Sequence, residues 1–524
     1  MSIVHKFGLA MLAAALGSSA LAGPTVQVAQ GKVEGIVKDG VEAYRAIPYA
    51  QAPEGNLRWR APEPAQSWPG VRDASRAGPA CYQADGGAGW GPYTAEFIAP
   101  GPFAEDCLTA NIWTPARKTG RLPVFVFIHG GGFGGGGANV PIYDGATLAK
   151  RGVVVVTIQY RVGVFGFLAH PALSAESPIH SSGNYGLLDQ IEAIKWVKAN
   201  IARFGGDAAN ITIAGESAGA ASVSHLVVSP LAKGLFAKAV AFSGASMGVP
   251  VPPLREGEAV GVKLAEDLGK STPDELRNVS AAQLVERTRA IPDPGGKAPP
   301  LLFVPHVDGA VVLYDPSIGD RPIASNVAIM TGYNAAEMVD FSIDTPEKFE
   351  TAVRARYGDF ADRLLRLYPH ATRAEAEASN LLMARDRYMS GVLIWAKARQ
   401  KTSGQTVFDY LYDHPYPPAP QGKAYGAFHS SQIPYIFGNL GLGNRHFSAG
   451  DAKISRQWQD LLIAFMRKGN PSGPNGAWPP ASQTKGIKAM VIGDHPGFAP
   501  VISSTERFEA FRDYARQGGV LGLM

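Results

Sequence analysis

Short, uninterrupted apolar runs alternate along this chain with longer segments of helical periodicity. Residues 123 to 128 (Pro-Val-Phe-Val-Phe-Ile) and 153 to 158 (Val-Val-Val-Val-Thr-Ile) are apolar without alternation, which is typical of strands buried on both faces. From 187 to 204 the apolar side chains form one stripe, which predicts a helix. Further strands are predicted at 211–214, 240–242, 327–330 and 407–412. The alternation predicts an α/β fold, with a mostly parallel central sheet flanked by helices.

Two later segments lack these clean strand signals. Residues 250 to 300 and 344 to 400 have mainly helical patterns, joined by turns rich in proline and glycine, and we expect them to be helical insertions. We find no internal repeat and no linker long enough to divide domains. We therefore expect residues 23 to 524 to form a single domain.

The first 22 residues have the pattern of a secretory signal peptide. Lys6 supplies positive charge, residues 7 to 16 are almost wholly apolar, and Ala20-Leu21-Ala22 is a small-x-small cleavage site. This run is too short to span a membrane, and no later stretch reaches about 18 apolar residues. We expect a secreted or periplasmic protein after cleavage, without stable membrane insertion.

Composition narrows the range of partners. The chain is 46% hydrophobic and 18% charged, which is ordinary for a globular protein with a large core. Its net charge of +4 is spread along the sequence rather than clustered, so no nucleic-acid partner is indicated. The composition leaves the oligomeric state open.

Two cysteines, Cys81 and Cys107, lie a short distance apart. In an exported chain this spacing suggests a disulfide, and two separate buried thiols are the alternative. The loop between them is rich in glycine and aromatic residues, including Trp90, Tyr93 and Phe97, and it could shape the entrance to a site.

Residues 215 to 219 (Gly-Glu-Ser-Ala-Gly) stand between a predicted strand and a helical pattern. A serine on such a sharp turn is exposed, and the flanking glycines avoid a clash, so Ser217 is the candidate nucleophile. Residues 244 to 248 match the same pattern. They are followed by Pro250, Pro252 and Pro253, which cannot start a helix, so Ser246 is not expected to act.

A glycine-rich loop follows the predicted strand at 123–128. It begins His129-Gly130-Gly131-Gly132-Phe133, and glycines let backbone N–H groups approach a developing oxyanion. We expect the N–H groups of Gly131, Gly132 and Ala218 to form an oxyanion hole, and His129 to be structural. A phosphate-binding loop is disfavoured because the Gly-Lys-Ser/Thr ending is missing. A merely flexible loop is the other alternative.

The acid and base are harder to choose from the residues alone. His429 follows the predicted strand at 407–412 and a flexible loop, as a base near the carboxyl edge of a sheet should. His414, His370 and His306 are other candidates among the 11 histidines. Glu337 follows the strand at 327–330 within a short loop, which suits an orienting carboxylate, but a surface glutamate would look the same.

Seven stretches, in this order, resemble one known family. They are Ala-Ile-Pro-Tyr-Ala (46–50), Glu-Asp-Cys-Leu (105–108), His-Gly-Gly-Gly-Phe (129–133), Asn-Tyr-Gly-Leu-Leu-Asp-Gln (184–190), Phe-Gly-Gly-Asp (204–207), Gly-Glu-Ser-Ala-Gly (215–219) and Gly-Ala-Phe-His (426–429). The chain resembles the type-B carboxylesterases, an α/β-hydrolase group that includes para-nitrobenzyl esterases and cholinesterases. The matches cover most of the chain after residue 22.

The resemblance implies a triad of Ser217, Glu337 and His429. The acid lies in a Gly-x-Asn-x-x-Glu stretch, but the family's usual Asp-Glu-Gly is Ala-Glu-Met here, and Asp340 is the fallback acid. The resemblance further implies three supporting residues and a disulfide; these are Glu216, Ser243, Gln432 (where many members have Glu) and the pair Cys81–Cys107.

We therefore expect an exported serine carboxylesterase that hydrolyses small-molecule carboxylic esters through an acyl-enzyme, with no metal or organic cofactor. Activity should fall as the histidine, with an ordinary pKa of about 6.5, gains a proton. An amide or carbamate hydrolase with the same machinery, and a non-catalytic binding relative, are the alternatives. Trp90 does not match the spacing of the cholinesterase choline-binding residue, so that specificity is not inferred. Phe133 and the 81–107 aromatics suggest an apolar gorge, with simple packing as the alternative.

Overall fold

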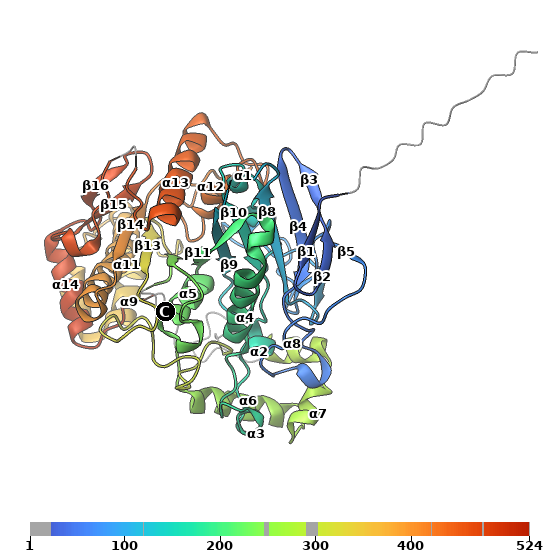
Figure 1. The fold of residues 1–524 in the computed structure, drawn as a ribbon. Coiled ribbons are helices and arrows are strands. Elements are labelled where there is room, and N and C mark those ends of the chain that lie inside the picture. Colours follow the sequence, from blue (N-terminus) through green and yellow to red (C-terminus); the bar gives the residue numbers. More distant parts are fainter. Residues whose placement is uncertain are drawn as a thin grey trace, which may run out of the picture.

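The computed structural model describes residues 23–118, 120–245, 251–289, 302–420, 422–473 and 476–522 (Figure 1). The predicted signal peptide at 1–22 lies outside these residues, and so does Ser246. In the part of the chain that the structure describes, no helix combines the length and the apolar character needed to cross a membrane.

One 11-stranded sheet crosses the molecule. Its order is β16-β15-β14-β13-β12-β11-β9-β10-β8-β4-β3, and it is parallel from β15 to β10 and antiparallel at both ends. The parallel strands are β9 (Leu122–Ile128), β10 (Val154–Ile158), β11 (Gly206–Glu216), β12 (Lys238–Phe242), β13 (Ala328–Asn334), β14 (Val407–Tyr412) and β15 (Lys488–Ile492). The antiparallel strands are β3 (Ile36–Lys38), β4 (Val41–Pro48), β8 (Thr109–Pro115) and β16 (Gly497–Pro500). The predicted mostly parallel sheet is confirmed.

Two small sheets were not predicted. One contains β1 (Thr25–Val28), β2 (Gly31–Glu34) and β5 (Val71–Asp73), and the other pairs β6 (Ala80–Cys81) with β7 (Phe103–Ala104). These strands have at most four residues, and β5 is fully exposed, so neither an apolar run nor a sustained alternation marks them.

The side chains of β9 show why the central strands are apolar throughout. Val124, Val126 and Ile128 belong to the core under α4 (Tyr185–Asn200) and α5 (Ala218–Val228). Phe125 and Phe127 belong to a second core, under α12 (Ile433–Phe437) and α13 (Ala449–Lys468). The strand thus buries both faces, as the uninterrupted pattern predicted, and helices cover the sheet on both sides (Figure 1).

The predicted helical insertions follow β12 and β13. The first contains α6 (Leu254–Asp267), α7 (Pro273–Arg277) and α8 (Ala281–Arg289), and the second contains α9 (Pro346–Tyr357), α10 (Ala361–Leu365) and α11 (Arg373–Ser403). The remaining α-helices are α1 (Ala146–Ala149), α2 (Gly163–Phe167), α3 (Pro171–Glu176) and α14 (Thr505–Arg516). The 3-10 turns are η1 (Gly55–Leu57), η2 (Ala95–Phe97), η3 (Pro141–Tyr143), η4 (Ile201–Phe204), η5 (Pro230–Ala232), η6 (Gly358–Phe360) and η7 (Ala481–Gln483).

The boundaries around the nucleophile strand differ slightly from prediction. The expected helix at 187–204 is α4 followed by η4, and it ends at Gly205, whose φ of 86° is the left-handed conformation that glycine adopts easily. Strand β11 begins at Gly206 rather than at Ile211, with an irregularity in its register to β9 between these residues. The extra residues, Gly-Asp-Ala-Ala-Asn, include no large apolar side chain, so no apolar run marks them.

Candidate active site

Ser217 lies at a sharp turn between β11 and α5. Its φ of 57° and ψ of −123° are outside the regions that non-glycine residues usually adopt. A Cβ at Gly215 would lie 2.2 Å from the carbonyl oxygen of Gly219, and a Cβ at Gly219 would lie 2.1 Å from that of Ile128. Both glycines are therefore required, and Ser217 is left half-buried among buried neighbours.

The glycine-rich loop after β9 lies directly against this turn. A Cβ at Gly130 would come within 2.9 Å of the Cβ of Ser217. Gly131 and Gly132 have φ of 113° and 61°, so the loop needs glycine at both positions. Among the hydrogen bonds of the described residues, none uses the N–H of Gly131, Gly132 or Ala218 as donor. The three groups remain available for an oxyanion.

His129 is part of the support beneath this loop. It is 1% exposed, its ring stacks on Tyr160 at 4.3 Å, and the Tyr160 hydroxyl donates to the His129 carbonyl over 2.9 Å. Burial lowers the pKa of His129 to about 4, so its ring is neutral at ordinary pH. These contacts agree with the structural role expected from the sequence.

The structure brings His429 and Glu337 together. The N–H of Ala336 donates to the carbonyl of Ala427 over 2.9 Å, and residues 336 and 428 pair as a short parallel bridge beyond β13 and β14. This bridge sets the two loops side by side, and Nδ1 of His429 hydrogen-bonds Oε1 of Glu337. Glu337 is fully buried, so it is not the surface glutamate that the sequence left open.

The second oxygen of Glu337 is held by two donors. The backbone N–H of Asn334 donates to it over 2.8 Å, and the hydroxyl of Ser243 over 3.1 Å. Gln432 donates to the Ser243 hydroxyl over 3.4 Å. The three expected residues Glu337, Ser243 and Gln432 therefore lie in one network, which fixes the orientation of the carboxylate.

Asn334 is a member of this network that the sequence did not single out. Its side-chain N–H group donates to Oε1 of Gln432 and to the carbonyl of Phe428, both over 2.6 Å. It thereby ties the end of β13 to the loop that carries the histidine. The only signal was its fixed place in the Gly-x-Asn-x-x-Glu stretch, which does not say what it contacts.

Glu216 approaches His429 from the other side. Its Oε1 lies 3.2 Å from Nε2 of the ring and accepts a hydrogen bond from the Ser430 hydroxyl over 2.6 Å. Burial raises the pKa of Glu216, although the neighbouring His429 counters part of this effect. Glu216, which immediately precedes Ser217, therefore connects the nucleophile turn to the imidazole, and it is 2% exposed.

Two carboxylates decide the charge of His429. Burial alone would favour the neutral ring, but Glu337 and Glu216 stabilise the cation more strongly, and the pKa of His429 lies above the ordinary 6.5. The ordinary value expected from the sequence is wrong for this reason. The arrangement stabilises an imidazolium, which is the form a general base reaches after it accepts a proton.

The alternative acid and bases lie elsewhere. His414 has its ring nitrogens 3.1 Å from Asp451 and 2.8 Å from Asp494. His370 hydrogen-bonds the carbonyl of Tyr368 over 2.7 Å. The exposed carboxylate of Asp340 accepts from the N–H and hydroxyl of Ser342. Of the candidates raised by the sequence, Glu337 and His429 are the pair that the structure joins.

The expected disulfide between Cys81 and Cys107 is present. Within its loop, the rings of Tyr93 and Phe97 pack on Phe428 with centroids 5.6 and 5.8 Å away. Because Phe428 immediately precedes His429, the loop packs against the segment that carries the histidine. Burial, followed by the fields of Glu216 and Glu337, raises the pKa of the Tyr93 phenol well above its ordinary value, which places Tyr93 near both carboxylates.

Two other aromatic residues considered for the substrate pocket differ in burial. Phe133 is fully buried and meets Phe167 edge to face at 5.1 Å, so for this residue the packing interpretation fits. Trp90 is 64% exposed and leans on Tyr93. Arg445 is a residue the sequence did not suggest; it donates to Glu96 over 2.8 Å and to the Thr94 hydroxyl over 2.7 Å, and so anchors the loop from within.

Comparison with known proteins assigns the chain to a family. A sequence model described as the carboxylesterase family matches residues 22–504. The chain belongs to this family. The resemblance drawn from the seven sequence stretches is thereby confirmed, and so is the α/β-hydrolase fold.

Individual relatives of this carboxylesterase are named as esterases. The fumonisin B1 esterase of Sphingopyxis macrogoltabida is 36% identical over 466 residues, covering 86% of this chain and 83% of that protein. The para-nitrobenzyl esterase of Bacillus subtilis (strain 168) is 33% identical over 86% of this chain and 91% of its own. A solved thermophilic PNB esterase has a TM-score of 0.78 and 30% identity, covering 93% of this chain and 99% of that one. The protein is a carboxylic ester hydrolase.

Proposed function

We propose that Ser217, His429 and Glu337 form the catalytic triad of this serine carboxylesterase. One observation carries the proposal. The imidazole of His429 is held at Nδ1 by Glu337, while its Nε2 points to the elbow residue Glu216, next to Ser217. An imidazole oriented by a buried carboxylate beside the nucleophile turn is one part of the arrangement that acyl transfer requires, and the hydrogen bond from Ser217 to this imidazole is the part that we propose.

The reaction then follows from the charges. Neutral His429 accepts the proton of the Ser217 hydroxyl as its oxygen attacks the ester carbonyl, and Glu337 stabilises the resulting imidazolium. The free N–H groups of Gly131, Gly132 and Ala218 donate to the oxyanion; losing one such donor typically costs about 3 to 4 kcal/mol of transition-state stabilisation. His429 next protonates the departing alcohol. Water, activated by the same ring, releases the acid from Ser217.

The substrate is proposed to be a small ester with an apolar or aromatic part. The support is the disulfide-closed loop, whose aromatic residues Tyr93 and Phe97 lie over Phe428 beside the proposed base. We also propose that residues 1–22 direct export and are removed, leaving residues 23–524 as one domain. The chemistry of the N-terminal segment, with its basic start and apolar centre, supports this.

The decisive experiment compares the two serines that share the Gly-x-Ser-x-Gly pattern. In Ser217→Ala, kcat for p-nitrophenyl acetate should fall by several orders of magnitude, on the order of 10⁴-fold or more. Ser246→Ala is the matched control and should keep wild-type kcat. A reactive organophosphate should label the wild type and the Ser246→Ala variant stoichiometrically, but not Ser217→Ala. Normal hydrolysis by Ser217→Ala would refute the nucleophile assignment.

The wild-type protein can also be used to determine which type of bond is cleaved. Esters, anilides and carbamates that share one acyl or aryl group should be compared by kcat/KM. We expect the ester to be preferred, since alkoxide and phenolate leave more readily than amide nitrogen. A carbamate or anilide cleaved faster than its matched ester would replace esterase by the alternative hydrolase.

A further inference from the structure

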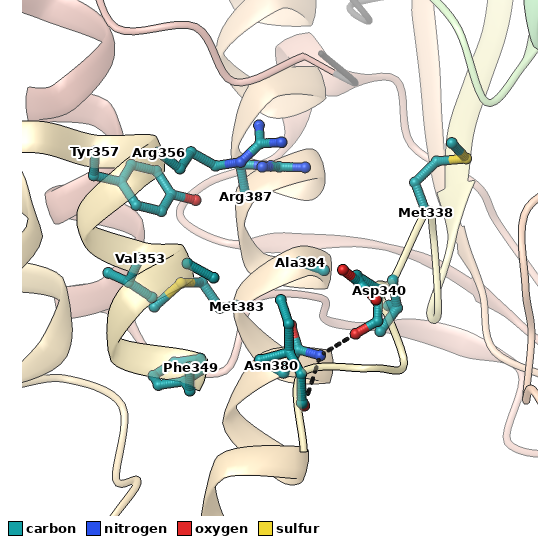
Figure 2. A pocket seen from close by; sticks show the side chains of 13 residues that line it. Met338, Asp340, Phe349, Val353, Arg356, Tyr357, Asn380, Met383, Ala384 and Arg387 are labelled. Atoms are coloured by element: carbon teal, nitrogen blue, oxygen red, sulfur yellow. Dashed lines mark hydrogen bonds between the residues drawn. The ribbon is translucent and has the colours of Figure 1, made fainter. Parts of the chain in front are cut away.

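A cavity lies between α9, α11 and the loop that follows Glu337, and the nucleophile turn does not line it (Figure 2). Its volume is about 110 Å³, several times what one water molecule needs. It is lined on one side by Arg356, Tyr357 and Arg387, and on another by Phe349, Val353 and Met383. The cavity therefore has a basic end and an apolar wall.

Arg387 is a buried cation without a carboxylate. It is 6% exposed, its guanidinium stacks over the Tyr388 ring at 4.4 Å, and it donates to the hydroxyl of Tyr388. Its Nε has no hydrogen-bond partner. Among the ion pairs formed by the described residues, none includes Arg387. An unneutralised buried charge is costly, so such a residue needs an explanation.

Arg356 adds a second positive charge at the same end. Its side chain lies at the exposed rim, and in Figure 2 its guanidinium lies beside that of Arg387. Desolvation and then repulsion by Arg387 lower the pKa of Arg356, which agrees with their proximity. No ion pair of the described residues includes Arg356 either. Two adjacent guanidinium groups match the two oxygens of a carboxylate or phosphate.

Asp340 is the one carboxylate on the cavity wall, and it does not neutralise the arginines. It lies on the other side of the cavity in Figure 2, and its Oδ1 accepts from the N–H and hydroxyl of Ser342 at 2.9 and 2.7 Å. The Asn380 amide donates to the Asp340 carbonyl over 2.9 Å, which holds this segment on α11. Asp340 is therefore expected to oppose an incoming anion weakly.

We propose that this cavity binds a small amphipathic carboxylate. Its carboxylate lies on Arg387 and Arg356, and its hydrocarbon part lies on Phe349, Val353 and Met383. The apolar wall favours an organic acid over inorganic phosphate, and the basic end favours the acid over the corresponding alcohol. Carboxylic acids of this kind are the products of ester hydrolysis. The site does not depend on the proposed triad.

Butyrate is a suitable probe, since it has one carboxylate and a short chain. Calorimetric titration into the Ser217→Ala protein at pH 8 should give one site per chain. Butan-1-ol and inorganic phosphate should each bind at least about tenfold more weakly, because each lacks one of the two recognised features. Equal binding of butanol, tighter binding of phosphate, or no butyrate binding would each overturn the proposal.

Variants separate this cavity from binding at the catalytic centre. Arg387→Gln and Arg356→Gln should each weaken butyrate binding by about tenfold or more. Arg354→Gln is the matched control, since it removes the same charge from the same helix but lies in ion pairs with Glu350 and Asp362. It should bind as the wild type does, and Asp340→Asn should bind more tightly.

Because Arg356 is exposed, Arg356→Gln is expected to fold even if Arg387→Gln does not. If Arg387→Gln does not fold, as judged by circular dichroism, Arg356→Gln alone decides. Unchanged affinity in Arg356→Gln, or equal losses in Arg356→Gln and Arg354→Gln, would show that butyrate does not use the basic end. Either result contradicts the site.

Discussion

The active site and the cavity between α9 and α11 both bury a cationic group, and they neutralise it differently. His429 lies between the carboxylates of Glu337 and Glu216, so this site contains its own counter-charges. Arg387 donates to the Tyr388 hydroxyl, and no ion pair among the described residues includes it. The first region needs no external anion to stabilise a proton on its ring, whereas the second leaves a guanidinium for a ligand to neutralise.

Arg161 shows how this fold treats an arginine whose role is structural. It is as buried as Arg387 and also lies over a tyrosine ring, that of Tyr185, at 5.3 Å. Asp189, however, accepts from its Nε and Nη2 over 2.8 and 2.7 Å. Comparison of the two arginines therefore isolates the missing carboxylate as the difference between a structural residue and a proposed binding residue.

The largest expected effect tests the counter-charges of the active site. Glu337→Gln should lower kcat by about 10³- to 10⁴-fold, because the neutral amide cannot stabilise the imidazolium and favours the wrong tautomer. Asp340→Asn is the matched control, three residues along the chain, and should keep wild-type kcat. Steady-state kinetics on a p-nitrophenyl ester measures both. A larger loss in Asp340→Asn would transfer the acid role to that residue.

Removing the partner of Arg161 should make it resemble Arg387. Asp189→Ala leaves a buried, unpaired guanidinium, and the free energy of unfolding should fall by about 3 to 5 kcal/mol. Arg387→Gln removes an unpaired charge instead, and it should change the free energy by less than about 1 kcal/mol. Urea unfolding followed by circular dichroism gives both values. Similar losses of unfolding free energy in the two variants would mean that Arg161 and Arg387 do not differ in their dependence on a carboxylate.

Glu216→Gln tests whether the charge of Glu216 raises the pKa of His429. His429 must be neutral to act as a base, so kcat/KM rises with pH through the pKa of the free enzyme. In the wild-type protein, which has both carboxylates, the inflection of kcat/KM against pH should lie above pH 6.5. Loss of the Glu216 charge should move it down, on the order of one pH unit. An inflection that does not move would mean that Glu216 exerts no charge effect on the ring.

The smallest effect concerns the support of Glu337. Ser243→Ala removes one of the two donors to the second carboxylate oxygen but leaves the Asn334 N–H in place. A lost hydrogen bond of this kind is worth about 1 kcal/mol, so kcat should fall several-fold, with KM nearly unchanged. A fall as large as that of Glu337→Gln would mean that the carboxylate moves when Ser243 is lost.

The sequence predicted the features that local chemistry fixes. Strands buried on both faces are apolar throughout, and the turn at Ser217 needs glycine at 215 and 219. Both features can therefore be recognised in the amino-acid sequence. Short strands such as the half-exposed β1 and the fully exposed β5 have too few residues for a pattern. The acid and base needed a family resemblance, because a histidine or glutamate looks the same wherever it lies.

Contacts between distant segments were beyond prediction. The Ser430 bond to Glu216 joins residues 214 positions apart, and Arg445 holds Glu96 across 349 positions. The cavity at Arg387 arises where α9 packs against α11, and neither helix alone indicates that the guanidinium lacks a carboxylate. Such features follow from packing, which no local periodicity encodes.

The bridge between residues 336 and 428 has a consequence for how such enzymes diversify. It fastens the segments that carry Glu337 and His429 directly to one another, at the ends of two neighbouring strands. The spacing of the proposed acid and base is therefore set by this bridge, and the exposed surface of α9, α10 and α11, which lie between Glu337 and β14, can change without altering it. Substitutions at that surface can therefore alter which ligands bind there while the spacing of Glu337 and His429 is kept.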